Sequence, residues 1–231
     1  MDEKYLVNAF EDSLGKDLAE ILGDSLEFGI DACLDDSILR DVPFVGAAFK
    51  LYSIGSKVHD KHCYIKLVSF IQSVNSGECT AAKIQERKVK FAEKASFRKQ
   101  ELEYILILID RYIGFEKPQM LGKIYLAYLD GDLNWDDLTR YAEIVDRFLP
   151  GDYAFLASST TKFITYANVG SEALLRLMAL GLVAEESNRA PLVGDGRGGW
   201  AVSASSINLA NRKRKDYVRT AFGQRLVSIL K

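Results

Sequence analysis

Apolar residues recur at three- and four-residue steps along the first part of the chain, and this spacing lines one face of an α-helix. The clearest case opens the sequence, with Leu6, Phe10, Leu14, Leu18 and Leu22 in register. This pattern predicts that the chain begins with a helix whose apolar side packs against neighbouring elements.

Proline, glycine and asparagine divide the apolar pattern into separate helices. A second helix is expected over residues 44–73, between the break at Asp41-Val42-Pro43 and the turn Asn75-Ser76-Gly77. The strongly charged segment 80–99 predicts a solvated helix with a bend.

The run Ile105–Ile109 has no polar side. It fits either a buried strand or a helix buried all round, and the flanking helix formers favour the helix. Further on, Pro118 suits the first turn of a helix, and Asn134 is typical of the N-cap of a helix that Pro150 ends. Residues 1–150 are thus predicted to form a bundle of about five or six helices.

The C-terminal part of the chain has a different pattern. The segment GSEALLRLMALGLVAEE predicts a helix running into a short strand at Gly181-Leu182-Val183. The turn GDGRGG separates APLV from WAVSAS, as in a hairpin, and DYVRTAFGQRLVSIL predicts a strand followed by a helix. We therefore expect a mainly α fold, with a helical bundle over residues 1–150 and an α+β module over residues 151–231.

The order of these C-terminal elements resembles the second half of a winged-helix domain. The resemblance is carried by Leu174-x-x-Leu177-x-x-Leu180-Gly181-Leu182-Val183, a hairpin, and Tyr217-x-x-Thr220-x-x-Gly223-x-x-Leu226. It implies that residues 171–180 correspond to the recognition helix of winged-helix transcription factors, and that residues 189–199 lie in the wing.

The first half is similar to a widespread group of small bacterial proteins, most of them uncharacterised. The similarity lies in Pro43-Phe-Val-Gly46, Lys50-Leu51, the charged His59-Asp60-Lys61, Lys66-Leu67 and the segment GFEKPQMLGKIYLAYLDGDLNWDDL. Such proteins often occur near mobile elements and phage-defence genes. The resemblance implies a biological setting and an architecture, and it implies no reaction.

Charge separates the two parts of the chain. The formal net charge is −2, but residues 170–231 hold ten basic and five acidic residues, giving +5, and residues 1–169 therefore carry −7. The C-terminal module is thus the candidate for binding an anionic partner. Its candidate binding residues are Arg176, Arg189, Arg197, Arg212, Lys213, Arg214, Lys215 and Arg219.

Base reading by the expected recognition helix is not favoured. Its polar face presents Ser171, Glu172 and Arg176, a poor set for the major groove, and Glu172 would repel phosphate. A protein partner is therefore at least as well supported as a nucleic acid.

Metal, cofactor and catalytic motifs are weak throughout. His59, His62 and Cys63 share a helical face but lack the rest of a zinc signature, so no metal site is predicted. Gly194-x-Gly196-x-x-Gly199 matches the dinucleotide fingerprint without its strand–helix context. Nucleophilic catalysis by serine or cysteine usually needs a base, and the two histidines sit together in the helical half. We expect neither a cofactor nor an enzyme.

The opening segment MDEKYLVNAFEDS lacks the basic region of a secretory signal, and three cysteines fit a reducing cytoplasm. The apolar stretch Val42–Ile54 is interrupted by Lys50 and is too short to span a bilayer. The favoured hypothesis is a non-enzymatic bacterial interaction protein, an accessory or effector in phage defence, with a protein partner or self-association. The alternatives are a winged-helix DNA-binding regulator and a membrane-active effector working through residues 42–56.

Overall fold

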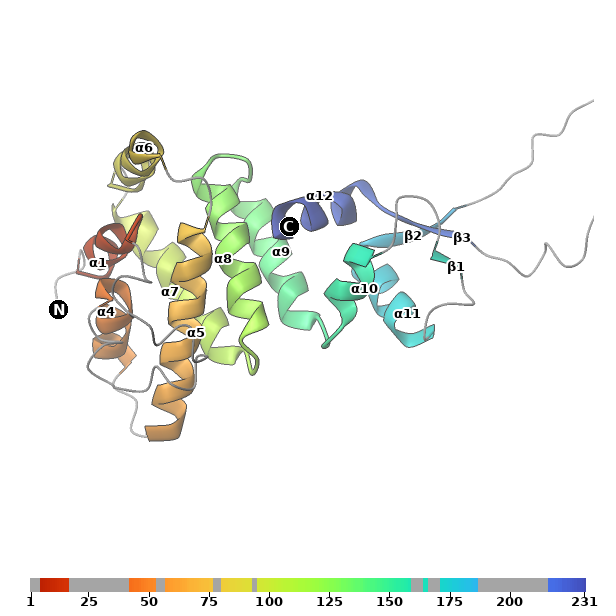
Figure 1. Ribbon diagram of the computed structural model, residues 1–231, viewed down its shortest axis with the longest axis horizontal. Helices are drawn as coiled ribbons and strands as arrows, with labels where there is room; N and C mark the ends of the chain where they lie inside the picture. Colours follow the sequence, from red (N-terminus) through yellow and green to blue (C-terminus); the bar gives the residue numbers. More distant parts are fainter. Residues whose placement is uncertain are drawn as a thin grey trace, which may run out of the picture. The chain divides into compact units, whose positions relative to one another are not determined.

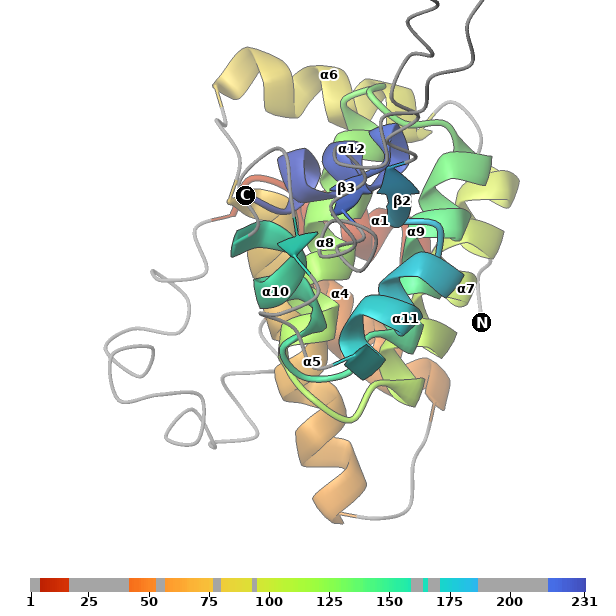
Figure 2. The ribbon, with the colours of Figure 1, turned by 90° about the vertical axis from the view of Figure 1, so that its right-hand side faces the viewer.

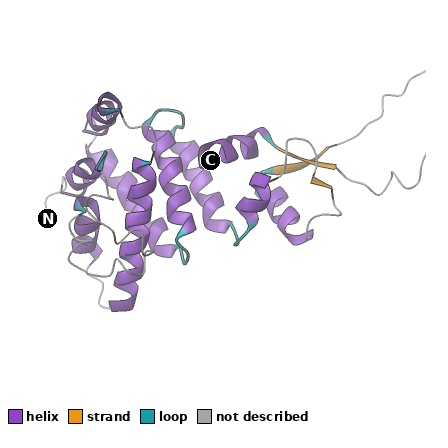
Figure 3. Ribbon diagram, in the orientation of Figure 1, coloured by secondary structure: helices purple, strands orange, loops and turns teal. Residues whose placement is uncertain are grey.

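The structure is a computed structural model. The residues that it describes are 5–16, 42–52, 57–76, 80–92, 95–158, 164–165, 171–186 and 216–231. The chain divides into two compact units, an N-terminal unit of Met1–Arg147 with Leu230 and a C-terminal unit of Phe148–Ile229 with Lys231. The described part is mainly helical, and all of its strands belong to the C-terminal unit (Figure 3).

The N-terminal unit is a bundle of helices (Figure 1). They are α1 (Tyr5–Ser13), α4 (Pro43–Tyr52), α5 (Lys57–Asn75), α6 (Ala81–Ala92), α7 (Ala95–Arg111), α8 (Glu116–Leu129) and α9 (Trp135–Arg147). Helices α5 and α8 pack side by side along their length, and α6 lies across one end of the bundle (Figures 1 and 2).

Several predicted helix ends are confirmed. Pro43 is the first residue of α4, and Pro118 lies in the first turn of α8. Asn134 caps α9, because its Oδ1 accepts the backbone N–H of Asp137 at 2.8 Å. Each of these residues acts on its own stretch of backbone, which is why the local sequence predicts it.

Two expectations for the bundle are wrong in part. Residues 44–73 form two helices, α4 and α5, with residues 53–56 outside the described residues. The run Ile105–Ile109 is helical as predicted, but Ile107 is 52% exposed, so this helix is not buried all round. Consecutive residues of a helix point in directions about 100° apart, so one of five faces solvent when the helix packs on one side.

The core of the bundle is built around Phe10, which comes from α1 and is fully buried. The centroid of its ring lies 5.0 Å from those of Phe44 and Phe91, 5.6 Å from that of Tyr125 and 6.5 Å from that of Phe70. All four neighbours are buried, and each comes from a different helix. One side chain therefore joins α1 to α4, α5, α6 and α8.

Polar caps between helices fix the position of α1. The Oγ of Ser13 donates to the carbonyl oxygen of Ala9 at 2.9 Å and accepts the N–H of Phe44, at the start of α4, at 3.0 Å. Asn75, the last residue of α5, accepts the N–H of Gly15 at 3.0 Å and donates to the carbonyl oxygen of Ser13 at 2.9 Å. Backbone groups left over at helix ends thus bind side chains of neighbouring helices.

The C-terminal unit combines helices with a small antiparallel sheet. Its elements are α10 (Asp152–Ser158), β1 (Ile164–Thr165), α11 (Ser171–Ala179), β2 (Val183–Glu186), β3 (Asp216–Arg219) and α12 (Ala221–Leu230). The strand order is β1-β3-β2, with Tyr217 opposite both Ile164 and Glu185. The strand and helix predicted in DYVRTAFGQRLVSIL are confirmed, whereas the hairpin predicted within residues 190–205 lies outside the described residues.

The predicted motif residues of this unit meet where β3 joins α12. Thr220 donates from Oγ1 to the carbonyl oxygen of Gly181 at 2.7 Å and from its backbone N–H to that of Leu182 at 3.0 Å. Its Oγ1 also accepts the N–H of Gly223 as the N-cap of α12. Gly181 has a φ of 71° and ends α11, so the strand predicted at residues 181–183 begins only at Val183.

Gly122 is the close-contact position between α5 and α8. A Cβ added there would lie 2.5 Å from the backbone oxygen of Phe70 and 2.6 Å from the Cβ of Ser73. Gly122→Ala is therefore expected to lower the free energy of unfolding by about 1–3 kcal/mol, because the two helices must separate. Gly114→Ala is the matched control, since a Cβ there meets no atom within 4 Å. Urea unfolding followed by circular dichroism measures both, and equal stability of the two variants would contradict the packing.

Candidate functional site

The predicted recognition helix, α11, is anchored by an ion pair between the half-buried Arg176 and the buried Asp152. Asp152, at the start of α10, is 1% exposed. Its carboxylate receives hydrogen bonds from Nη2 of Arg176 at 2.8 Å, from Nε of Arg176 at 3.2 Å and from the N–H of Leu149 at 2.9 Å. Arg176 therefore neutralises a carboxylate of its own unit, which takes up hydrogen bonds that an external anion would need.

The exposed face of α11 is acidic and apolar. Glu172 and Ala179 are exposed, and Leu175 is 62% exposed. These three residues follow the spacing of one helical face. The described surface of this helix thus carries one carboxylate and a large apolar side chain, and its one arginine is held by Asp152.

Six of the eight predicted binding residues lie outside the described residues. The other two are Arg176 and Arg219, and Arg219 is a half-buried residue of β3 opposite Val183. The six are Arg189, Arg197, Arg212, Lys213, Arg214 and Lys215. The prediction that these eight residues form one binding surface therefore stays a prediction.

The charge of the C-terminal region is concentrated in the connection between β2 and β3. Residues 187–215 hold six basic residues and one acidic residue, giving +5, while residues 170–186 and 216–231 together hold four of each. The last pair of the ladder is Glu186 opposite Asp216, so this connection leaves and re-enters the sheet at the same end. Positive charge is therefore attached to one end of the sheet, and α11 contributes none of the excess.

The residues weighed as metal ligands do not form a site within the described part of the chain. His62 is exposed and stacks on Phe115, with ring centroids 5.8 Å apart and planes 10° apart. Cys63 is half-buried, and the side chain of His59 lies outside the described residues. Among the described residues, no three His, Cys, Asp or Glu side chains are grouped so as to hold a metal ion.

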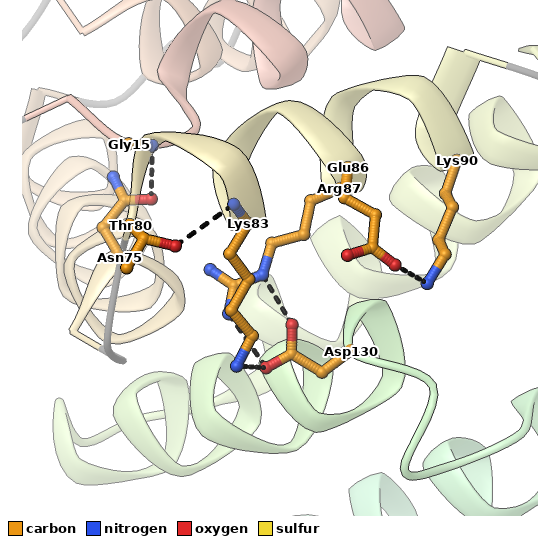
Figure 4. A network of polar contacts seen from close by, with 8 residues as sticks. All are labelled: Gly15, Asn75, Thr80, Lys83, Glu86, Arg87, Lys90 and Asp130. Atoms are coloured by element: carbon orange, nitrogen blue, oxygen red, sulfur yellow. Dashed lines mark hydrogen bonds and ion pairs between the residues drawn. The ribbon is translucent and has the colours of Figure 1, made fainter.

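In the N-terminal unit, Asp130 forms ion pairs with two cations of α6 (Figure 4). Arg87, which is buried, donates from Nε at 2.6 Å and from Nη2 at 2.8 Å, and Nζ of Lys83 lies 3.2 Å away. Burial alone would raise the pKa of Asp130, but the hydrogen bonds from Arg87 and Lys83 hold it below its ordinary value. Asp130 follows α8, so this cluster attaches α6 to the bundle.

A second polar cluster joins α6, α7 and α8 and includes a fully buried carboxylate, Glu101. Nη1 of Arg98 donates to Glu101 at 2.6 Å and to the hydroxyl of Tyr128 at 2.9 Å, and that hydroxyl donates to Glu101. The guanidinium of Arg98 also lies over the rings of Phe91 and Tyr128. Burial and the hydrogen bond to Glu101 raise the pKa of Tyr128 to about 12.

Lys66 is a further buried cation with a structural role. It is 4% exposed and donates from Nζ to the carbonyl oxygens of Asp110 and Tyr112, both at 2.9 Å. Burial lowers the pKa of Lys66, although Cys63 and Asp110 act in the opposite direction. These carbonyl groups lie at the C-terminal end of α7, where an ammonium group satisfies acceptors left by the helix.

A shallow hollow of about 630 Å³ lies between α1 and α4. Tyr5, Asp12, Gly46 and Lys50 are among its lining residues, and Lys50 donates from Nζ to the Tyr5 hydroxyl at 3.1 Å. None of the residues predicted to bind a partner or a metal lines it.

The apolar stretch weighed as a membrane element packs inside the N-terminal unit. Val42, Phe44, Val45 and Ala47 are completely buried. Within the described ranges, no helix is both long enough and apolar enough to cross a membrane.

Comparison with known proteins gives no match among family models, curated proteins or solved structures. The function proposed below is therefore argued from this chain itself.

Sequence reasoning missed Asp152. Its signal is an aspartate directly after Pro150-Gly151 and before an apolar helix, a position from which the side chain binds backbone at the helix start.

Removing the cation from the Asp152 pair should destabilise the protein. We expect Arg176→Gln to lower the urea midpoint, because the carboxylate of Asp152 stays buried and loses its only described cationic partner. Lys90→Gln is the control, since Lys90 pairs with Glu86 at 2.7 Å on an exposed helix face. Equal shifts for the two variants would show that the Asp152 pair adds nothing.

Alkaline pH should destabilise the fold through Tyr128. The pKa of a tyrosine in the unfolded chain is near 10, whereas burial and Glu101 raise the pKa of Tyr128 to about 12 in the folded chain. The unfolded state therefore loses its proton first, and the free energy of unfolding falls as pH rises from 10 to 12. Tyr128→Phe is expected to show a shallower fall over this interval, measured by urea unfolding at each pH. An unchanged slope would exclude Tyr128 as the source.

Proposed function

We propose that the protein is a non-enzymatic interaction protein in which the C-terminal unit binds a protein partner through α11. The observation that carries this proposal is the exposed face of α11, where Leu175 is 62% exposed beside Glu172 while Arg176 binds Asp152. A nucleic-acid phosphate would be repelled by Glu172 and would find no uncommitted arginine on this helix. A protein surface with an apolar pocket would bury Leu175.

The arrangement of the C-terminal unit supports a winged-helix-like module as the scaffold for this contact. Its described order is α10, β1, α11, β2 and β3, and its strand order is β1-β3-β2. In such a module the helix before β2 is the one that faces the partner, and the β2–β3 connection corresponds to the wing. The helical N-terminal unit would then be the scaffold or effector part.

The second candidate function is nucleic-acid binding through the connection between β2 and β3. It is favoured by the +5 charge of residues 187–215, which are joined to the sheet at the Glu186–Asp216 pair. Contacts by these cations would neutralise phosphates without reading bases, and binding would fall steeply with salt. A membrane-active effector is not favoured, because Val42, Phe44 and Ala47 are buried in the bundle.

An accessory or effector role in phage defence is the biological setting that we propose, on the strength of the sequence resemblance. Its partner would then be a host or phage protein. Capture from infected and uninfected cells would distinguish a phage-dependent partner from a constitutive one.

The test compares two variants in two assays. The first assay is the capture of a partner protein from infected and uninfected cells. Leu175→Lys should abolish capture of the partner protein, because it places a charge in the proposed apolar contact. Replacing Arg212, Lys213, Arg214 and Lys215 by alanine should leave that capture unchanged. Leu149→Lys is the matched control, since Leu149 is an exposed leucine of the same unit, at 50%.

The second assay is fluorescence anisotropy with duplex DNA and with RNA at a series of salt concentrations. Under the first proposal, neither nucleic acid binds at low salt. Salt-sensitive binding that the four alanines remove and Leu175→Lys preserves would instead establish the nucleic-acid function.

A further inference from the structure

Trp135, at the start of α9, contacts aromatic rings of α7 and α8. The centroid of its ring system lies 6.1 Å from that of Phe97, 5.6 Å from that of Tyr104 and 5.8 Å from that of Tyr128. The planes meet at 68°, 69° and 61°, so all three contacts are edge-to-face. We call Phe97, Tyr104 and Trp135 the aromatic surface, and Tyr128 of α8 adjoins it.

The aromatic surface is accessible to solvent. Phe97 is 41% exposed, and Tyr104 and Trp135 are each half-buried. Burying these rings completely in the bundle would gain free energy, so their partial exposure leaves aromatic area available at the surface. Tryptophan and tyrosine are also the residues that most often dominate the energetics of protein interfaces.

Carboxylates flank the aromatic residues in the sequence of both helices, and one of them, Glu143, contacts Tyr104. The Tyr104 hydroxyl donates to Oε1 of Glu143 at 3.4 Å, and Asp136, next to Trp135, is exposed. On α7 the side chain of Glu103 is 45% exposed and forms a loose ion pair with Nζ of Lys99 at 3.8 Å.

A cation already lies against this group of rings. The guanidinium of Arg98 lies 5.5 Å from the ring centroid of Tyr128, and its charge is balanced by the buried Glu101. The charge of Arg98 is therefore compensated inside the protein. Helix α9 carries four acidic and two basic residues, so this side of the aromatic surface has an excess of negative charge.

We propose that the aromatic surface binds a lysine or arginine side chain from a cationic segment of a partner protein. The ring faces would contact the cation, and Glu103, Asp136 and Glu143 would attract the charge. An anionic ligand would be repelled by these carboxylates, and an uncharged segment would leave them unused. This site lies in the N-terminal unit and is independent of the partner proposed for α11.

Tryptophan fluorescence can report on this site directly. The chain has two tryptophans, so Trp200→Phe leaves Trp135 as the only one. Titrating this variant with a hexa-arginine peptide should give a saturable change in fluorescence, and a hexa-glutamine peptide should give none. Added choline should compete, because a quaternary ammonium contacts aromatic faces without donating hydrogen bonds.

Variants on α7 separate aromatic recognition from general attraction by charge. In the Trp200→Phe background, Phe97→Ala should weaken hexa-arginine binding by about two- to fivefold, the effect of one exposed cation–π contact. Glu103→Gln should also weaken it. Ile107→Ala is the matched control and should leave affinity unchanged, because Ile107 is an exposed apolar residue of the same helix, at 52%, and is not one of the rings.

Three outcomes would overturn the proposal. One is the absence of saturable binding by hexa-arginine. Another is equal binding by the uncharged peptide, which would indicate an apolar docking surface. The last is affinity that responds to Glu103→Gln and not to Phe97→Ala, which would indicate attraction by charge alone. Thermal unfolding of each variant by circular dichroism confirms that the exposed substitutions leave the fold intact.

Discussion

The burial of Phe10 is the interaction on which the N-terminal unit depends. Its ring touches rings from α4, α5, α6 and α8, so one side chain links most of the bundle. Edge-to-face packing, as with Phe44 and Tyr125, adds a directional preference to the hydrophobic gain. The caps made by Ser13 and Asn75 hold the C-terminal end of α1, which keeps the ring of Phe10 in place.

Several cations of the described residues bind acceptors of the protein itself. Arg87 and Lys83 bind Asp130, Arg98 binds Glu101, and Lys66 binds backbone carbonyls. Buried charges require such partners, because desolvation without a partner costs several kcal/mol (roughly 3–5 when a partner is removed). Basic residues counted along the sequence therefore overstate the charge that the described surface offers to an external anion.

Local chemistry made part of the fold predictable from sequence. Pro43, Pro118 and Asn134 mark helix starts because each acts on its own backbone. The ion pair of Arg176 could not be predicted from sequence, because Asp152 is 24 residues away and only the folded unit brings the two side chains together. The aromatic surface could not be predicted for the same reason, since its rings come from α7 and α9.

The Glu186–Asp216 pair at the end of the ladder has a consequence for divergence of the chain. The hydrogen bonds from Thr220 to Gly181 and Leu182 hold the start of β2 against the end of β3, at the end of the ladder opposite the connection. Lengthening such a connection adds only slowly to the entropy of closing it, about 0.6 kcal/mol for each doubling. The length and charge of this connection can thus change in evolution at little cost to the sheet and α12.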